Sequence, residues 1–181
     1  MFVGNDWKKF NTPSNDLVKS FDAEADAVRK TATVKFEAVG WADNYWPSSN
    51  YPFAWKQRDT SGNQNNYILR LADILLFKAE AKVKTGAFGE ATTLINQIRS
   101  RAGLTPIATI TSEADGINKV LHERKLELAF EGHRWFDLVR TGRALDLLPT
   151  VTSANQTLFP IPLSELLSNS NPGMTQNPGY Q

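Results

Sequence analysis

The chain has no cysteine and only two histidines among its 181 residues. The absence of cysteine excludes disulfides, thiolate metal sites and cysteine nucleophiles, and two histidines leave few ligands for a catalytic zinc. Lysine and arginine number 20 against 19 acidic residues, so the chain lacks the basic excess that is typical of nucleic-acid-binding proteins. We therefore expect no metal, no cofactor and no nucleic-acid partner.

Long apolar runs and secretory features are also missing. The longest uninterrupted apolar run is residues 74–77, far shorter than the roughly 20 residues of a membrane-spanning helix. Residues 1–7 show neither the charged nor the apolar region of a secretory signal. Apolar residues still make up 41% of the chain, enough for a real core at this length. We predict a single domain over residues 1–181.

The first third of the chain combines three local patterns. A capping residue, Ser14 or Asn15, precedes apolar residues at helical spacing, which predicts a short helix. Residues 31–38 alternate polar and apolar side chains, the pattern of a half-exposed strand. Residues 40–66 are rich in proline, glycine, asparagine and serine, which argues against regular structure there. Long irregular segments inside compact domains are uncommon and often functional.

The middle of the chain is predicted to be helical. Residues 67–84 and 88–101 carry apolar side chains at helical spacing, and Gly86 separates them. Because the connection is short, the two helices should pack antiparallel as a hairpin. The spacing of small and apolar residues in the second helix follows the later half of a tetratricopeptide repeat. One such unit cannot bury its own faces, so it needs neighbours.

Further helices are predicted after this hairpin. One begins near Ser112, with Asp115 as its capping-box partner, and extends to about residue 130. Gly132 should break the chain before a helix over residues 134–147. A short helical turn is predicted at residues 164–167 of a tail that is otherwise rich in asparagine and proline.

The irregular segment concentrates aromatic and amide side chains that suit sugar binding. Sugars present an apolar C–H face on which an indole can stack, and a hydroxyl rim that amides and charged groups can hydrogen-bond. The candidate ligand-binding residues are Trp41, Asn44, Tyr45, Trp46, Asn50, Tyr51 and Trp55. The alternative is that these aromatic side chains only cover helices of the core.

Three carboxylates lie along one stripe of a predicted helix. Glu123, Glu127 and Glu131 recur at i, i+4 and i+8. Such carboxylates could serve acid–base catalysis, but we expect them to form ion pairs with nearby arginines. These arginines are Arg124, Arg134, Arg140 and Arg101. A zinc-protease motif would need a second histidine at Leu126. We therefore expect no enzyme activity.

Several ordered blocks resemble the C-terminal portion of SusD/RagB-family outer-membrane nutrient-binding lipoproteins. The blocks are residues 68–81, 95–104, 160–162, 176–180 and, most distinctively, ERKLELAFEGHRWFDLVR at residues 123–140. Within that last block the resemblance identifies a structural signature. Its members are Glu123, Arg124, Glu127, Glu131, Gly132, Arg134, Trp135, Asp137 and Arg140.

The resemblance implies both a fold and a function. It implies a mainly α, SusD-like C-terminal domain with a tetratricopeptide-like helical hairpin, long irregular loops and minor β content. It also implies non-catalytic capture of an oligosaccharide or polysaccharide at the surface of the bacterial outer membrane. The captured nutrient would pass to a SusC-like, TonB-dependent transporter.

The family's proteins are longer than this chain. Their N-terminal helical-repeat half, signal peptide and lipidated cysteine have no counterpart in the sequence, so we expect a fragment whose only membrane contact would be that missing anchor. Two other functions stay open. The chain could be a scaffold or docking domain that contacts the transporter with no ligand site of its own, or it could be an unrecognised glycosidase with two carboxyls across an open cleft.

Overall fold

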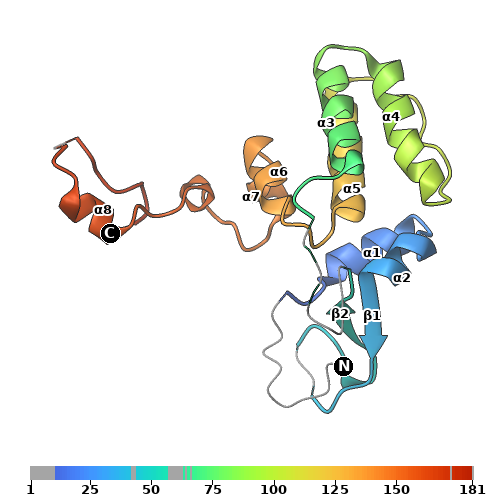
Figure 1. Cartoon of the computed structure of the whole chain (residues 1–181), viewed down its shortest axis with the longest axis horizontal. Coiled ribbons are helices and arrows are strands. Elements are labelled where there is room, and N and C mark those ends of the chain that lie inside the picture. Colours follow the sequence, from blue (N-terminus) through green and yellow to red (C-terminus); the bar gives the residue numbers. More distant parts are fainter. Residues whose placement is uncertain are drawn as a thin grey trace. The chain divides into compact units, whose positions relative to one another are not determined.

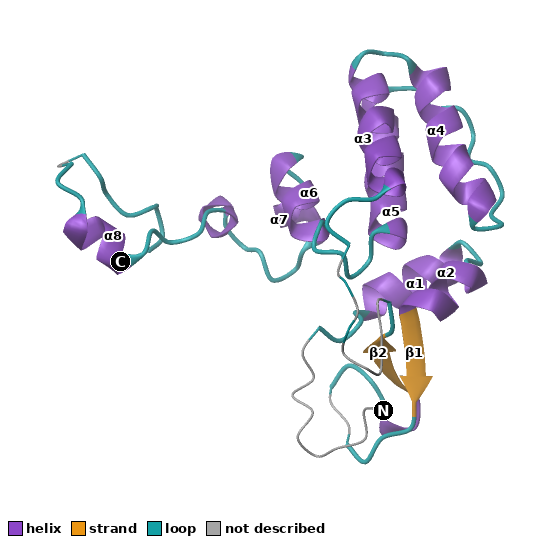
Figure 2. Ribbon diagram, in the orientation of Figure 1, coloured by secondary structure: helices purple, strands orange, loops and turns teal. Residues whose placement is uncertain are grey.

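A computed structural model of the chain describes residues 11–41, 44–56, 63, 65, 67–171 and 173–180. The chain forms two compact units, residues 1–134 and residues 135–181. The described residues contain eight α-helices and one two-stranded sheet (Figures 1 and 2). This confirms the predicted mainly α fold with minor β content. No helix among the described residues is long and apolar enough to cross a membrane.

Two short helices open the first unit. The helix α1 (Asn15–Ala23) is capped by Ser14, whose hydroxyl accepts a hydrogen bond from the Leu17 backbone nitrogen at 3.1 Å, as predicted. Ala25 has a φ of 53° and turns the chain. Asp26 then caps α2 (Ala27–Thr33) by accepting from the Arg29 nitrogen at 3.1 Å.

The strand β1 (Val34–Glu37) pairs antiparallel with β2 (Tyr51–Ala54). The strand prediction for residues 31–38 was therefore wrong at its start, because the helix capped by Asp26 continues to Thr33. The prediction of irregular structure was wrong at β2, where the backbone nitrogen of Trp55 donates to the oxygen of Thr33 at 2.8 Å. Hydrogen-bonded pairs alternate along an antiparallel ladder, so Pro52, opposite Phe36, falls at a position that needs no N–H donor.

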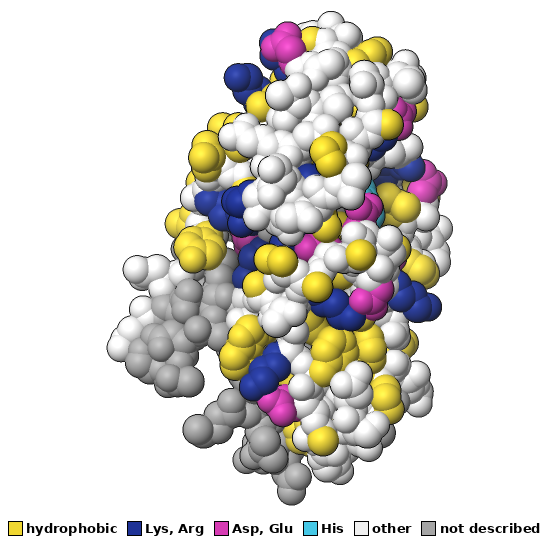
Figure 3. Space-filling model, turned by 90° about the vertical axis from the view of Figure 1, so that its right-hand side faces the viewer, with side chains coloured by type: hydrophobic (Ala, Val, Ile, Leu, Met, Phe, Trp, Pro, Cys, Tyr) yellow, Lys and Arg dark blue, Asp and Glu magenta, His cyan; other side chains and the backbone are white. Residues whose placement is uncertain are grey.

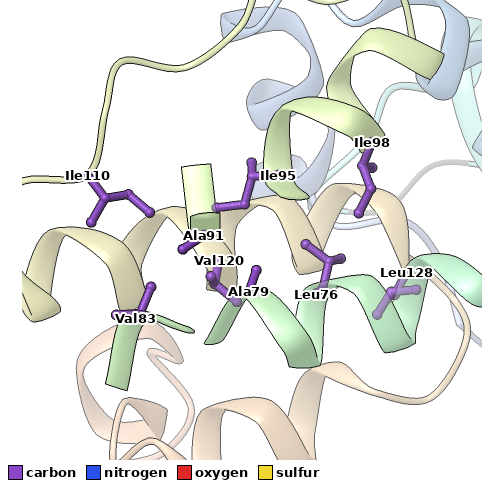
Figure 4. Packing of buried hydrophobic residues seen from close by; sticks show 9 residues of the cluster. All are labelled: Leu76, Ala79, Val83, Ala91, Ile95, Ile98, Ile110, Val120 and Leu128. Carbon is purple, nitrogen blue, oxygen red and sulfur yellow. The ribbon is translucent and has the colours of Figure 1, made fainter. Parts of the chain in front are cut away.

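The larger core lies among three helices. The helices α3 (Leu71–Lys84) and α4 (Phe88–Arg101) form the predicted hairpin around Gly86, which has a φ of 76°. The helix α5 (Glu113–Glu127) packs against α3 and α4 and is capped by Ser112, as predicted. Figure 4 shows the buried side chains that these helices bring together with the segments that flank α5. The cluster is Leu76, Ala79, Val83, Ala91, Ile95, Ile98, Ile110, Val120 and Leu128.

Two helix boundaries differ from the prediction. The first helix of the hairpin begins at Leu71, four residues after Tyr67, because the backbone of Arg70 directly before it is extended, with a φ of −146° and a ψ of 162°. The helix α5 ends at Glu127, and Phe130 and Gly132 follow with φ values of 64° and 82°. Both positive φ values are incompatible with a continuing helix.

The C-terminal segments contain short elements. The predicted helix over residues 134–147 is divided into α6 (Arg134–Arg140) and α7 (Ala144–Leu147), because Gly142 adopts a φ of 67°. A small cluster of Leu138, Ala144 and Val151 holds these helices, with Trp135 packed against it as the sequence predicted. A 3-10 helix (Ala154–Thr157) and α8 (Leu163–Ser168), at the predicted helical turn, follow.

Candidate functional site

Three of the predicted ligand-binding residues pack into the protein. Tyr51 is only 1% exposed, and its ring lies 5.5 Å from the ring of Phe53 and 6.1 Å from that of Trp41. The Trp46 indole nitrogen donates to the Pro13 carbonyl oxygen at 3.0 Å. The edge-on contacts of these rings with their aromatic neighbours are those expected of packed aromatic side chains.

The other four predicted residues reach solvent. Tyr45 is 77% exposed, and Asn44 and Asn50 are exposed as well. Trp55 is half-buried and follows β2 directly. The structure therefore divides the candidate residues into a packed set and a solvent-facing set. A ligand role for either set stays a prediction.

A hollow of about 730 Å³ lies beside Trp55. Its walls come from the turn between α1 and α2, from β1, and from the residue after β2. Figure 3 shows apolar side chains gathered in the lower half of the molecule, with basic and acidic side chains at their margins. Of the seven predicted residues, Trp55 lines this hollow, and sequence reasoning missed its other aromatic walls, Phe21 and Phe36. The alternation around Phe36 predicted a strand and gave no signal of a cavity.

The carboxylate stripe forms a buried network of ion pairs. Glu123 accepts from Arg29 at 2.6 Å and from Arg99 at 3.2 Å. Glu127 accepts from Arg29 at 3.3 Å, and from Arg70 and Arg101 at 2.7 Å each. Both carboxylates are at most 2% exposed. Each is therefore held by guanidinium groups from elements that are distant in sequence.

The same network holds the segment that carries Trp55. Lys56 contacts a Glu131 carboxylate oxygen at 2.5 Å and donates to the Glu127 backbone oxygen at 2.6 Å. Arg70 binds the Glu131 carboxylate at 2.7 Å and the Glu127 carboxylate at 2.7 Å. Both ends of the segment between Lys56 and Arg70 are thus attached to the same two acidic residues. The network fixes the position of the backbone next to Trp55.

The pKa values of Glu127 and Glu131 do not suit acid catalysis. Burial raises the pKa of Glu127, but the hydrogen bonds and charges of Arg70, Arg101 and Arg29 outweigh it and leave the pKa below its ordinary value. The pKa of Glu131 is lowered in the same way by Arg70 and Lys56 against the effect of burial. A general acid near neutral pH needs a raised pKa. These carboxylates therefore serve structure.

The arginines in the sequence signature have other partners. Arg124 pairs with Asp73 at 2.7 Å, and its guanidinium lies 4.3 Å from the centre of the Phe77 ring. Arg134 donates to the Leu121 carbonyl oxygen at 3.3 Å. Arg140 pairs with Asp137 at 2.7 Å.

Of the arginines expected to pair with the stripe, Arg101 binds Glu127 at 2.7 Å. The other arginines that pair with Glu123 or Glu127 are Arg29, Arg70 and Arg99, and all three lie outside the signature. Among the residues that the structure describes, no group of three or more histidine, cysteine, aspartate or glutamate side chains could hold a metal ion.

A protein-family model described as the SusD family matches residues 1–148. A SusD-like protein of Formosa agariphila is 36% identical over 126 residues, which are 64% of this chain and 25% of that protein. The starch-binding protein SusD of Bacteroides thetaiotaomicron is 32% identical over 126 residues, 63% of this chain and 21% of that protein. The chain thus spans about a quarter of the length of these relatives, and the match lies in their C-terminal part.

Solved structures show the same fold. A laminarin-binding SusD-like protein superposes with a TM-score of 0.73 at 30% sequence identity. The match covers 98% of this chain and 40% of that chain. A second structure, a SusD superfamily protein from Bacteroides vulgatus, has a TM-score of 0.65 at 28% identity, over 93% of this chain and 39% of that chain.

Proposed function

Because the chain belongs to the SusD family, we propose that it captures an oligosaccharide without converting it chemically. The captured glycan would pass to a SusC-like, TonB-dependent transporter at the surface of the bacterial outer membrane. The observation that carries the proposal is that two aromatic side chains, exposed Tyr45 and half-buried Trp55, reach solvent, in a chain with relatives that are named for binding starch and laminarin.

The exposed aromatic residues and the buried acidic stripe differ in what they can do to a sugar. The exposed aromatic and amide side chains offer a stacking face and hydrogen-bonding groups for a sugar. The acidic stripe, in contrast, is buried and paired, so it cannot present two carboxyls across an open cleft as a glycosidase requires. Binding on a fixed surface therefore suits these residues better than hydrolysis.

The proposal is tested by isothermal calorimetry of the whole chain against oligosaccharides of starch and laminarin. We expect saturable binding and, by chromatography of the recovered sugar, no change in its length. The absence of binding by a chain that circular dichroism shows to be folded would contradict glycan capture. Release of shorter sugars would contradict a non-catalytic role.

A docking role is the second candidate, and a row of exposed apolar side chains favours it. These residues precede and follow the start of α3. They are Tyr67, Ile68, Leu69, Leu71, Ile74 and Phe77, each between 43% and 84% exposed. Large exposed apolar patches are typical of protein interfaces, and these six residues lie within eleven positions of the sequence.

Sedimentation velocity over a range of concentrations tests the docking candidate. Self-association that is abolished by the double change Leu71→Gln and Ile74→Gln would support a protein-binding face on α3. A monomer at every concentration, with unchanged behaviour in the variant, would count against that face.

A further inference from the structure

The hollow beside Trp55 is formed by a tight turn and by small side chains. Ala25 adopts a φ of 53°, and Asp26 then caps α2, so the chain reverses over very few residues. Ala25 and Ala27 line the hollow, and their methyl groups leave space at its margin. Fully buried Phe21 closes it toward the core. Its volume of about 730 Å³ lies within the range of small-molecule sites.

Two aromatic rings at this hollow each lie beneath a lysine ammonium. The Lys35 nitrogen is 4.6 Å from the centre of the Trp55 ring. The Lys30 nitrogen is 5.6 Å from the centre of the Phe36 ring. All four residues line the hollow. The rings therefore offer apolar faces, and the ammonium groups offer hydrogen-bond donors directly beside them.

Each of the two ammonium groups also has a carboxylate partner. Lys30 contacts Asp22 at 2.5 Å, and Lys35 contacts Glu37 at 2.6 Å. These side chains are between 27% and 56% exposed. Exposed ion pairs contribute little to stability, so a ligand can rearrange them at small cost. Each ammonium group that lies over a ring is thus also next to a carboxylate.

We propose that this hollow is the subsite that holds a neutral sugar unit of the captured glycan, an inference that rests on the proposed function. The C–H face of the sugar stacks on Trp55, and Lys35 moves from the ring to the hydroxyl rim. Asp22 and Lys30 bind hydroxyl groups on the opposite side, where one accepts and the other donates. Phe36 supplies the second apolar wall.

Charge balance at the hollow favours a neutral ligand over an acidic one. The two lysines are matched by Asp22 and Glu37, and Asp26 is matched by Arg29. A carboxylate or sulfate on the sugar would therefore meet as much negative as positive charge, and would gain no net attraction. Uncharged hydroxyls can use both members of each pair.

Calorimetry of variants of the whole chain tests this subsite. The titrants are a neutral glucan oligosaccharide and a uronic-acid oligosaccharide. Trp55→Ala removes the stacking face, and Ala27→Trp fills the hollow from an exposed position at the start of α2. We expect each to weaken neutral-sugar binding by about tenfold or more. Trp55→Phe should restore part of the affinity, and the control Phe136→Ala, an exposed aromatic residue of α6 that does not line the hollow, should bind as the unaltered chain does.

The outcomes separate the subsite from the proposed function. Binding of neutral sugar that survives both Trp55→Ala and Ala27→Trp overturns the subsite and leaves glycan capture standing. Tighter binding of the uronic-acid sugar overturns the neutral ligand class. Failure of the folded, unaltered chain to bind either sugar overturns the proposed function, and the subsite with it.

Discussion

At the scale of single residues, the sequence predicted that the carboxylates of the acidic stripe are paired, but it did not predict most of their partners. The i, i+4, i+8 spacing of Glu123, Glu127 and Glu131 predicted paired carboxylates, and the structure pairs all three. The identity of the partners was less predictable. Arg29 lies 94 residues before Glu123 in the sequence, and no local pattern relates residues that far apart.

The network makes Glu127 the residue whose neutralisation should affect stability most. Glu127→Gln removes the charge that binds Arg29, Arg70 and Arg101, and leaves the buried Arg29 with fewer carboxylate partners. We expect the free energy of unfolding to fall by about 3 kcal/mol, measured by urea unfolding followed by circular dichroism. The matched control is Glu90→Gln, whose partner Lys82 lies on the surface, and it should leave stability unchanged. Equal stability of the two variants would show that the network is not a stabilising core.

At the scale of elements, helix existence was predictable and helix ends were not. The hairpin α3–α4 and the Ser112 cap followed from periodicity and capping residues. The strand β2 did not, because its stability comes from pairing with β1 and from burial of Tyr51 and Phe53, both of which depend on tertiary structure. The division of the aromatic residues into packed and solvent-facing sets could not be predicted for the same reason.

The packing of α5 against α3 depends on a glycine. A Cβ atom at Gly116 would lie 2.6 Å from a methyl group of buried Val83, so α5 could not keep its position. We expect Gly116→Ala to lower the thermal midpoint, with a loss of about 1 to 3 kcal/mol in stability. At Gly89 in α4 an added Cβ would meet nothing within 4 Å, so Gly89→Ala should stabilise slightly through its helix propensity. If both variants behave alike, close packing at Gly116 does not hold the helices in place.

At the scale of the whole molecule, stability should depend on acidity through the carboxylates that are paired in the folded state. The pKa values of Glu24, Glu127 and Glu131 lie below their ordinary value of 4.5, because hydrogen bonds and charges from arginine, lysine and histidine outweigh the opposing effect of burial. The folded chain therefore binds fewer protons than the unfolded chain near that pH. The resulting stabilisation is fully present above about pH 4.5 and is lost as the pH falls through the lowered values.

Urea unfolding at a series of pH values checks this dependence. We expect little change between about pH 6 and 7, and a decline in the free energy of unfolding below about pH 4.5. The variant Glu127→Gln should show a shallower decline, since one of the responsible groups is gone. A chain that becomes more stable on acidification would reverse the sign that the ion pairs require.

The function of the whole molecule is harder to predict from local sequence patterns than its helices are. Composition argued against a nucleic-acid partner, but the family was identified by long ordered motifs such as residues 123–140 and confirmed by the match over residues 1–148. The hollow at Trp55 needed the fold, because residues from α1, α2, β1 and the end of β2 form it together. Most of these residues lie within positions 21–36, but the sequence gives no measure of the space that the helix–turn–helix–strand path leaves between them.

Hydrogen–deuterium exchange of the whole chain, with and without a saturating neutral oligosaccharide, tests the central claim most directly. We predict slower exchange in peptides that cover residues 22–37 and 51–56, which surround the hollow, and unchanged exchange in the hairpin of residues 71–101. Protection confined to the hairpin, or no protection in either region, would contradict glycan capture at this surface.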